Sequence, residues 1–190
     1  MYKFYIFLLV IVIIACNNKE KQGVHKDLWT FEPAKNNPKL DELCIPIIHD
    51  YEVLIQCLIK NDTSDLKTKA KDLLLKLDTV SNSYTTNDTV MYLQFKSGLM
   101  NVQDEIQGVI LEKYPEDLNI AMNMVSIQLL HLLGGIGFNK QSVYIFNANG
   151  NNANVEEDGL IWLSLNKKSI NPYNNINNEL VTANYILQEN

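Results

Sequence analysis

Apolar residues recur at every third or fourth position in four successive segments between residues 38 and 133. This helical period gathers the apolar side chains on one face of each segment and predicts four amphipathic helices. The four faces are Ile47, Tyr51, Leu54 and Leu58; Leu66, Ala70, Leu73, Leu77 and Val80; Tyr92, Phe95, Leu99, Val102, Ile106 and Val109; and Ile120, Met122, Met124, Val125, Ile127, Leu129 and Leu130. The fourth segment is apolar nearly all round, so we expect it to be the most buried element.

Residues that start or stop helices separate these segments. The first segment covers about residues 38–60, and Pro46 is expected to break it or restart it, because proline suits the first helical turn and not the interior. Short polar side chains that cap helices precede the second and third helices, at 61–64 and 87–89. The third helix is expected over about 89–113 and the fourth from Pro115 to about Leu133, where Gly134 and Gly135 stop it.

The C-terminal part of the chain has a different pattern. Ser142 to Phe146 and Leu160 to Leu165 are runs typical of β-strands, and Tyr185 to Leu187 is a third candidate. The expected fold is therefore mostly α: a four-helix up-and-down bundle with a small C-terminal antiparallel β-sheet, formed by a single domain over residues 38–190.

The N-terminus carries a targeting signal. Lys3 precedes an apolar run from Phe4 to Ile14, which is too short to span a membrane, and the small residue Ala15 is followed by Cys16. This order is typical of a bacterial lipoprotein signal, so residues 1–15 are the expected signal peptide and Cys16 the lipidated residue. Residues 16–37 are then a flexible tether, on which Trp29 and Phe31 are candidates for docking on the domain.

This signal places the protein in the bacterial cell envelope, held by its lipid and facing the periplasm, with the outer membrane favoured over the inner. The net charge is −6 and all 16 basic residues are lysine. A nucleic-acid binder is expected to show a basic stripe and arginine, so nucleic acid is excluded as a partner. The expected partners are the membrane, through the lipid, and another envelope protein.

Two cysteines, Cys44 and Cys57, remain for the folded domain. If the segment between them is one helix, its rise of about 1.5 Å per residue holds them too far apart for a disulfide. We expect two free, buried thiols, with an intrachain disulfide or a metal pair as the alternatives.

The tail resembles a known family. Gly159 to Ser164 (Gly-Leu-Ile-Trp-Leu-Ser) and then Asn171-Pro172-Tyr173 are similar to the end of the family called domain of unknown function 3347. Trp162, Leu163, Ser164, Asn171, Pro172 and Tyr173 are the matching motif residues, and the similarity extends over about residues 40–187. The family occurs in lipidated or periplasmic proteins and in adaptors of heavy-metal efflux pumps.

The resemblance implies a soft-metal site that this chain has lost. The family carries Cys-Pro-Met after the strand that corresponds to Val143 to Ile145, and a later Met and Cys near the end. Here Ala148, Asn149 and Gly150 stand at the first motif, and Leu180 and Ala183 at the second. No Cys, Met or His follows His131, so no thiolate, thioether or imidazole is left in this part of the chain to bind Cu(I).

Other groups were weighed as replacement sites. His131 is interpreted as a core or end-of-helix histidine, and Met91, Met100, Met122 and Met124 as core residues. The acidic cluster Glu156 to Asp158 is interpreted as a solvated loop. The chain lacks the common catalytic motifs, so we expect neither an enzyme nor a cofactor.

The sequence therefore predicts a non-catalytic envelope lipoprotein, a binding or interaction module that is a degenerate relative of a periplasmic copper- or heavy-metal-handling family. The alternative is an active metal-binding chaperone or efflux accessory that uses ligands foreign to the family, such as Cys44 and Cys57.

Overall fold

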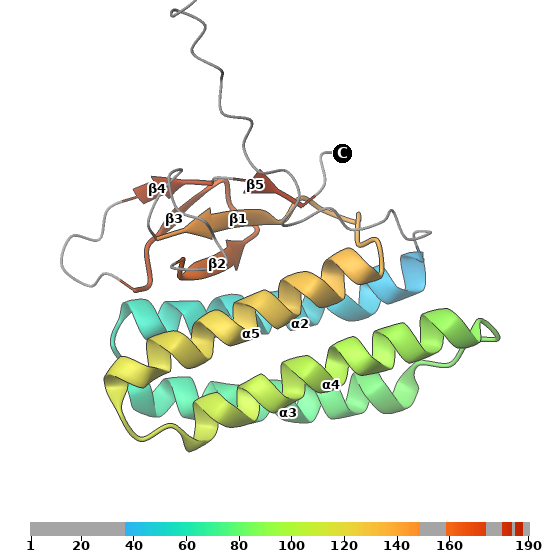
Figure 1. Ribbon diagram of the computed structural model, residues 1–190, viewed down its shortest axis with the longest axis horizontal. Coiled ribbons are helices and arrows are strands. Elements are labelled where there is room, and N and C mark those ends of the chain that lie inside the picture. The colour runs from blue at the N-terminus through green and yellow to red at the C-terminus, as the bar shows by residue number, and fades with distance from the viewer. Residues whose placement is uncertain (1–36, 149–158, 174–179, 184, 188–190) are drawn as a thin grey trace, which may run out of the picture. The chain divides into compact units, whose positions relative to one another are not determined.

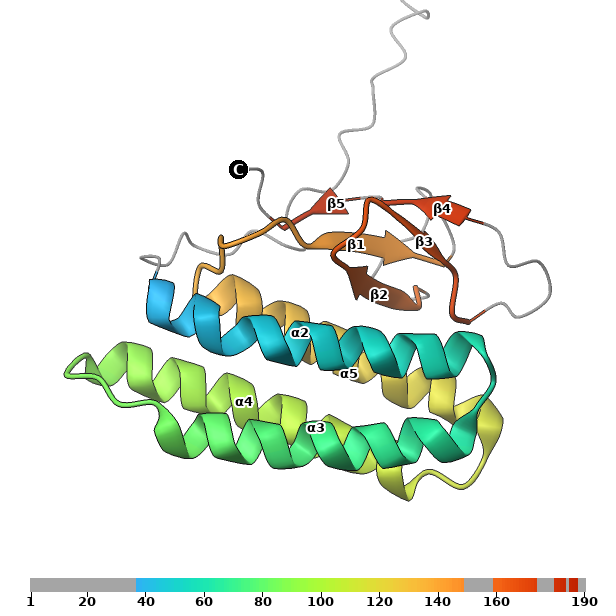
Figure 2. The ribbon, with the colours of Figure 1, turned by 180° about the vertical axis from the view of Figure 1, so that it is seen from behind.

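The computed structural model describes residues 37–148, 159–173, 180–183 and 185–187, all within the unit Phe31–Asn190. The expected signal peptide, Cys16, Trp29, Phe31, Gly150 and the acidic cluster 156–158 lie outside the described residues. Four helices follow one another and alternate in direction, as expected of an up-and-down bundle (Figures 1 and 2). They are α2 (Pro38–Ile59), α3 (Thr63–Ser83), α4 (Thr89–Leu111) and α5 (Pro115–Gly135).

The predicted caps are confirmed at the starts of α3 and α4. The side chain of Asp62 accepts the backbone N–H of Asp65 at 2.9 Å, and that of Asp88 accepts the N–H of Met91 at 3.0 Å. Asn37, at the end of the expected tether, caps α2 in the same way. Each such cap stabilises a helix by about 1 kcal/mol, so the helix starts are encoded locally.

Pro46 does not break the first helix, which corrects the prediction. Helix α2 continues from Pro38 to Ile59 with Pro46 inside it. Proline removes one helical hydrogen bond, the one to the carbonyl of Glu42. Both Glu42 and Pro46 are exposed, so water can replace that bond at the surface.

The buried faces of α3 and α4 are confirmed, apart from Tyr92, which is only half-buried. Helix α5 differs from the prediction at two points. Ile120 is 58% exposed, so the helix has an outer face, although Met122 is fully buried. The helix also includes Gly134 and Gly135 and ends at Gly135, and Gly137, the residue after the C-cap Ile136, has the φ of 65° of the left-handed conformation that terminates helices.

Among the described helices, α5 alone is long and apolar enough to cross a membrane, over Asp117–Gly135. Half of that segment is buried inside the unit. The helix packs against α4 and against a strand of the C-terminal region, which is the environment of a core helix in a bundle.

The C-terminal strands form two small antiparallel sheets where one was expected. Strands β2 (Ile161–Ser164), β1 (Tyr144–Asn147) and β5 (Tyr185–Ile186) form the first sheet in that order, close to the three predicted segments. The second sheet pairs β3 (Lys168–Ile170) with β4 (Leu180–Thr182). The sequence analysis missed these two strands, because each is only three residues long and neither has an alternating pattern.

The first sheet lies across α2 and α5, on the side of the bundle away from α3 and α4 (Figures 1 and 2). Strand β2 contacts both helices and is buried along its whole length. The Trp162 ring stacks on Phe146, with 5.0 Å between the ring centroids, and closes the core of this region.

Candidate functional site

Strand β2 is an edge strand whose free side is bound by side chains of the bundle. In an antiparallel pair, alternate residues direct their N–H groups away from the partner strand. The register of β1 and β2 makes these residues Ile161, Leu163 and Leu165. Their acceptors are, in that order, Asn123 Oδ1 at 2.7 Å, Tyr51 Oη at 3.1 Å and Glu52 Oε1 at 2.8 Å. These contacts use the N–H groups of the edge and attach the sheet to α2 and α5. They thereby close an edge that, if open, would be a template for pairing with another chain.

The Tyr51 hydroxyl is the centre of a buried chain of hydrogen bonds. It accepts the N–H of Leu163 and lies 2.7 Å from the hydroxyl of Ser126 on α5. Ser126 itself donates to the carbonyl of Met122 at 2.8 Å, so its single proton is already used and Tyr51 must be the donor between the two hydroxyls. Burial raises the pKa of Tyr51, which keeps that proton in place at neutral pH.

Glu52 binds the turn that follows β2. Its Oε1 accepts the hydroxyl of Ser164 and the N–H of Leu165, each at 2.8 Å. Its other oxygen lies 3.9 Å from Nδ1 of the exposed His49, one turn earlier on α2. The carboxylate is therefore committed mainly to holding the strand end in place.

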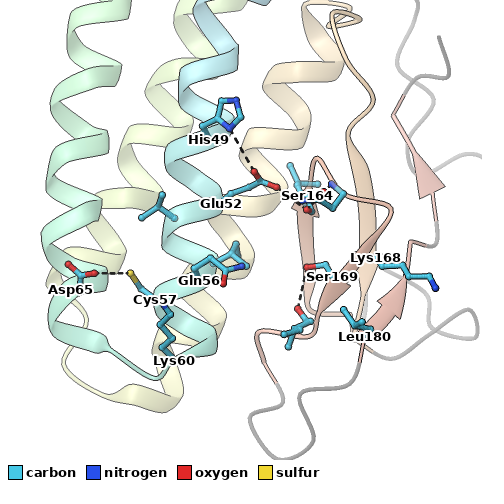
Figure 3. Close-up of a pocket in the computed structure, with 15 residues that line it drawn as sticks. His49, Glu52, Gln56, Cys57, Lys60, Asp65, Ser164, Lys168, Ser169 and Leu180 are labelled. Atoms are coloured by element: carbon cyan, nitrogen blue, oxygen red, sulfur yellow. Dashed lines mark hydrogen bonds and ion pairs between the residues drawn. The ribbon is translucent and has the colours of Figure 1, made fainter.

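A cleft of about 680 Å³ lies between the C-terminal half of α2 and the strands (Figure 3). Val53 and Leu180, which are 41% and 63% exposed, contribute apolar surface from α2 and β4. Glu52, Lys60 and Asp65 contribute charge of both signs. Its size and mixed lining fit a small ligand or a short segment of a partner.

Cys57 lines this cleft but is not poised as a nucleophile. Its Sγ donates to Oδ2 of Asp65 at 3.4 Å, as Figure 3 shows. Burial, followed by that bond and the charge of Asp65, raises the pKa of the Cys57 thiol to about 11. The thiol is therefore protonated at neutral pH, and the reactive form of cysteine is the thiolate.

Cys44 and Cys57 are both free and buried, as predicted. They lie 13 residues apart on one continuous helix, which separates them by roughly 20 Å at about 1.5 Å per residue. This distance prevents a disulfide and prevents one ion from binding both sulfurs. Burial, with a smaller contribution from Asp41, raises the pKa of the Cys44 thiol to about 12.

Within the described ranges, no three His, Cys, Asp or Glu side chains converge on a point that could hold a metal ion. His131 is exposed near the end of α5, which fits the end-of-helix interpretation. Met122 is a core residue as expected, but Met100 is 59% exposed, so the core interpretation is wrong for that residue.

Two of the positions at which the resemblance predicts lost ligands, Ala148 and Ala183, lie at one end of the first sheet. Strand β5 pairs antiparallel with β1, so the chain enters β5 beside the point at which it leaves β1. Ala148 follows β1 and Ala183 precedes β5, which puts both alanines at the same end. Leu180, at the third position, starts β4 and is exposed.

The residues of the family-like motif form a connected group around β2. Trp162 Nε1 donates to Ser169 Oγ at 3.1 Å, and its ring meets Tyr173 edge-on at 6.0 Å. Tyr173 Oη donates to the carbonyl of Ile161 at 2.7 Å, and Asn171 Oδ1 accepts the N–H of Tyr173 at 2.9 Å. Pro172 and Leu163 are buried and Ser164 binds Glu52. In this structure the motif residues therefore pack around β2 and help to close its edge.

Comparison of the chain with protein-family models, with curated proteins and with solved structures finds no match.

The sequence analysis did not identify Glu52, Asn123 and Ser126 as the residues that attach the sheet. Ser126 carried a signal, because it is a polar residue on a helix that is otherwise apolar at its buried positions. Glu52 and Asn123 have no such signal, since polar residues at the edge of an apolar face are ordinary.

Proposed function

We propose that this protein is a non-catalytic, lipid-anchored binding module of the bacterial cell envelope. We propose further that it descends from the metal-handling family that its tail resembles and has lost that family's soft-metal site. The placement of Ala148 and Ala183 at one end of the β1–β5 pair carries this proposal. Two ligand positions far apart in the sequence are useful for one ion only if the fold brings their strands together.

The cleft between α2 and the strands is the surface on which we propose that a ligand binds. Its apolar residues Val53 and Leu180 are exposed on opposite walls, whereas Glu52 is held by the β2 turn. The protonated thiol of Cys57 and the carboxylate that accepts from it favour recognition over covalent chemistry.

Restoring the lost ligands tests the proposed ancestry. The full chain, purified in detergent under reducing conditions, is titrated with Cu(I) against a competing chelator. We expect no tight binding by the native chain, and a gain of tight one-to-one binding in the variant Ala148→Cys/Ala183→Cys. The variant Ala148→Ser/Ala183→Ser is the matched control, because serine is close in size and offers no soft ligand.

Two results would contradict the proposal. If both double variants leave Cu(I) affinity unchanged, the two alanines do not occupy a former metal site. If the native chain binds Cu(I) tightly and keeps that binding in Cys44→Ser/Cys57→Ser, an unrecognised metal site exists, and the protein is an active metal binder.

The lipid anchor is tested separately. Cells that express the full chain are labelled with a radioactive or clickable fatty acid, which the native chain should incorporate. The variant Cys16→Ala should lose the label, because Cys16 alone follows the apolar run at the distance expected for cleavage. Label retained by this variant would show that Cys16 is not the lipidated residue.

A further inference from the structure

Strand β3 has an outer edge whose N–H groups find no acceptor among the described residues. In the pairing of β3 with β4, the N–H of Ala183 donates to the carbonyl of Lys167 at 3.1 Å, which fixes the residues that bond across this sheet. The alternate residues direct their N–H and C=O groups outward, and on β3 these residues are Lys168 and Ile170. The edge of β2, in contrast, has an acceptor for each of its three outward N–H groups.

This open edge borders the cleft. Lys168, Ser169 and Ile170 all line the cleft, whereas of β4 only Leu180 does. Consecutive side chains of a strand point to opposite faces of the sheet, so a cleft lined by three consecutive residues meets the strand along its edge. Figure 3 shows Ser169 across the cleft from Gln56 of α2. One wall of the cleft is therefore a helix and the other is an open strand edge.

An edge of this kind selects an extended polypeptide as its ligand. Outward N–H and C=O groups recur at every second residue of a strand, about 7 Å apart. An extended backbone carries donors and acceptors at the same repeat, and strand addition to a sheet edge is a recurring mode of peptide recognition. A small molecule of similar volume lacks this repeat, so the edge favours a polypeptide segment.

The charges around the cleft indicate what this segment carries. The carboxylates of Glu52 and Asp65 already accept hydrogen bonds from within the protein. The ammonium groups of Lys60 and Lys168 form no ion pair with any described residue. The charge that remains available is therefore positive, although the whole chain has a net charge of −6. Such a site is complementary to an acidic segment.

We propose that the cleft binds an extended, acidic segment of a partner protein, which adds to the open edge of β3 as a third strand of the second sheet. This inference rests on the binding role proposed above for the cleft and names the class of ligand. Directly opposed residues share one face of a sheet, so Ile170 lies in an apolar row with Leu180. Lys168, two positions earlier, lies on the same face. The added strand should therefore place an apolar residue beside Ile170 and, two positions away, an acidic residue beside Lys168.

Peptide selection on the full chain tests this pattern. Short random peptides displayed on phage are selected on the full chain in detergent, and the enriched peptides are synthesised. We expect an apolar and an acidic residue two positions apart, with no proline between them. When such a peptide binds, amide exchange should slow at Lys168 and Ile170, but not at Leu180 and Thr182, whose N–H groups point from the far edge of β4.

Substitutions separate the strand edge from the rest of the cleft. Ile170→Pro removes one outward N–H and leaves the bonds to β4, and Ile170→Val is the matched control that keeps this N–H. Peptide affinity should fall by roughly tenfold or more in Ile170→Pro and little in Ile170→Val, because the peptide loses a hydrogen bond only in the first. Lys60→Glu, at an exposed position on the other wall, should also weaken binding of the acidic peptide, independently of how β3 tolerates proline.

The outcomes that contradict the inference can be told apart from failure of the proposed function. No enriched peptide, peptides without acidic residues, or equal affinities for Ile170→Pro and Ile170→Val would refute strand addition. Peptides that lose affinity in Val53→Asp but not in Ile170→Pro would bind the cleft in another way, so the inference would fall and the binding role of the cleft would stand. Peptides unaffected by either variant would bind elsewhere and would contradict that role as well.

Discussion

Tyr51→Phe tests how the sheet is attached to the bundle. The substitution removes one oxygen and changes almost nothing else in a fully buried side chain. It leaves the N–H of Leu163, also fully buried, without its acceptor, and leaves Ser126 without the proton that Tyr51 donates. An unsatisfied buried donor costs about 1–3 kcal/mol and a lost hydrogen bond about 1 kcal/mol. We expect the free energy of unfolding to fall by about 2–3 kcal/mol.

Urea unfolding followed by circular dichroism measures this loss. The midpoint should fall while the slope with denaturant stays the same, because the folded core keeps its extent. Tyr114→Phe is the matched control, since Tyr114 is 60% exposed and its hydroxyl bonds to none of the described residues. Amide exchange should also become faster at Leu163 in Tyr51→Phe, because its N–H loses the acceptor that protects it.

A partner variant separates the two bonds. Ser126→Ala removes the acceptor of the Tyr51 proton but leaves the bond from Leu163 to Tyr51, so its cost should be smaller than that of Tyr51→Phe. The double variant should cost less than the sum of the two single variants, because they share one hydrogen bond. A loss below about 0.5 kcal/mol for Tyr51→Phe, the size of a surface substitution, would refute the reasoning.

Three further results are expected. Because the Cys44 thiol has a pKa of about 12 when folded and 9.0 ordinarily, the unfolded chain loses this proton first as pH rises. The free energy of unfolding should then fall from about pH 9 upward, by up to about 1.4 kcal/mol per pH unit, and Cys44→Ala should flatten this slope in urea titrations. Glu52→Ala should cost about 1–2 kcal/mol in thermal melts, against little for the exposed Glu42→Ala, and equal effects would argue against the strand-end contact. Chelation should leave the melting temperature unchanged, because apolar burial alone holds the bundle, and a large fall would reveal a structural metal.

The helices could be predicted because their signals are local. The apolar stripe of α3 and the caps at Asp62 and Asp88 are each complete within a few neighbouring residues. The predictions of helix breaks and helix ends failed where the outcome depends on the surroundings of a residue in the folded protein. Pro46 is tolerated because its turn is exposed. Helix α5 extends to Gly135 because Gly137, and not Gly134 or Gly135, has the left-handed conformation that terminates a helix.

The attachment of the sheet could not be predicted from patterns. Tyr51 and Leu163 are 112 positions apart, and no period in the sequence relates them. Tyr51 belonged to the predicted apolar face of its helix and its aromatic ring is buried there, but its hydroxyl serves a strand. The end of the sheet that holds Ala148 and Ala183 likewise depends on the pairing of β1 with β5.

The closed edge of β2 also bears on the order in which the chain folds. The four helices are joined by short connections, at 60–62, 84–88 and 112–114, so neighbouring helices can pair early. The bond between Tyr51 and Leu163 must close a loop of more than a hundred residues, which costs conformational entropy. The contacts that offset this cost form only when the strands assemble. We therefore expect the sheet to dock late, on a bundle already formed, so that removing the Tyr51 hydroxyl speeds unfolding and leaves the folding rate nearly unchanged.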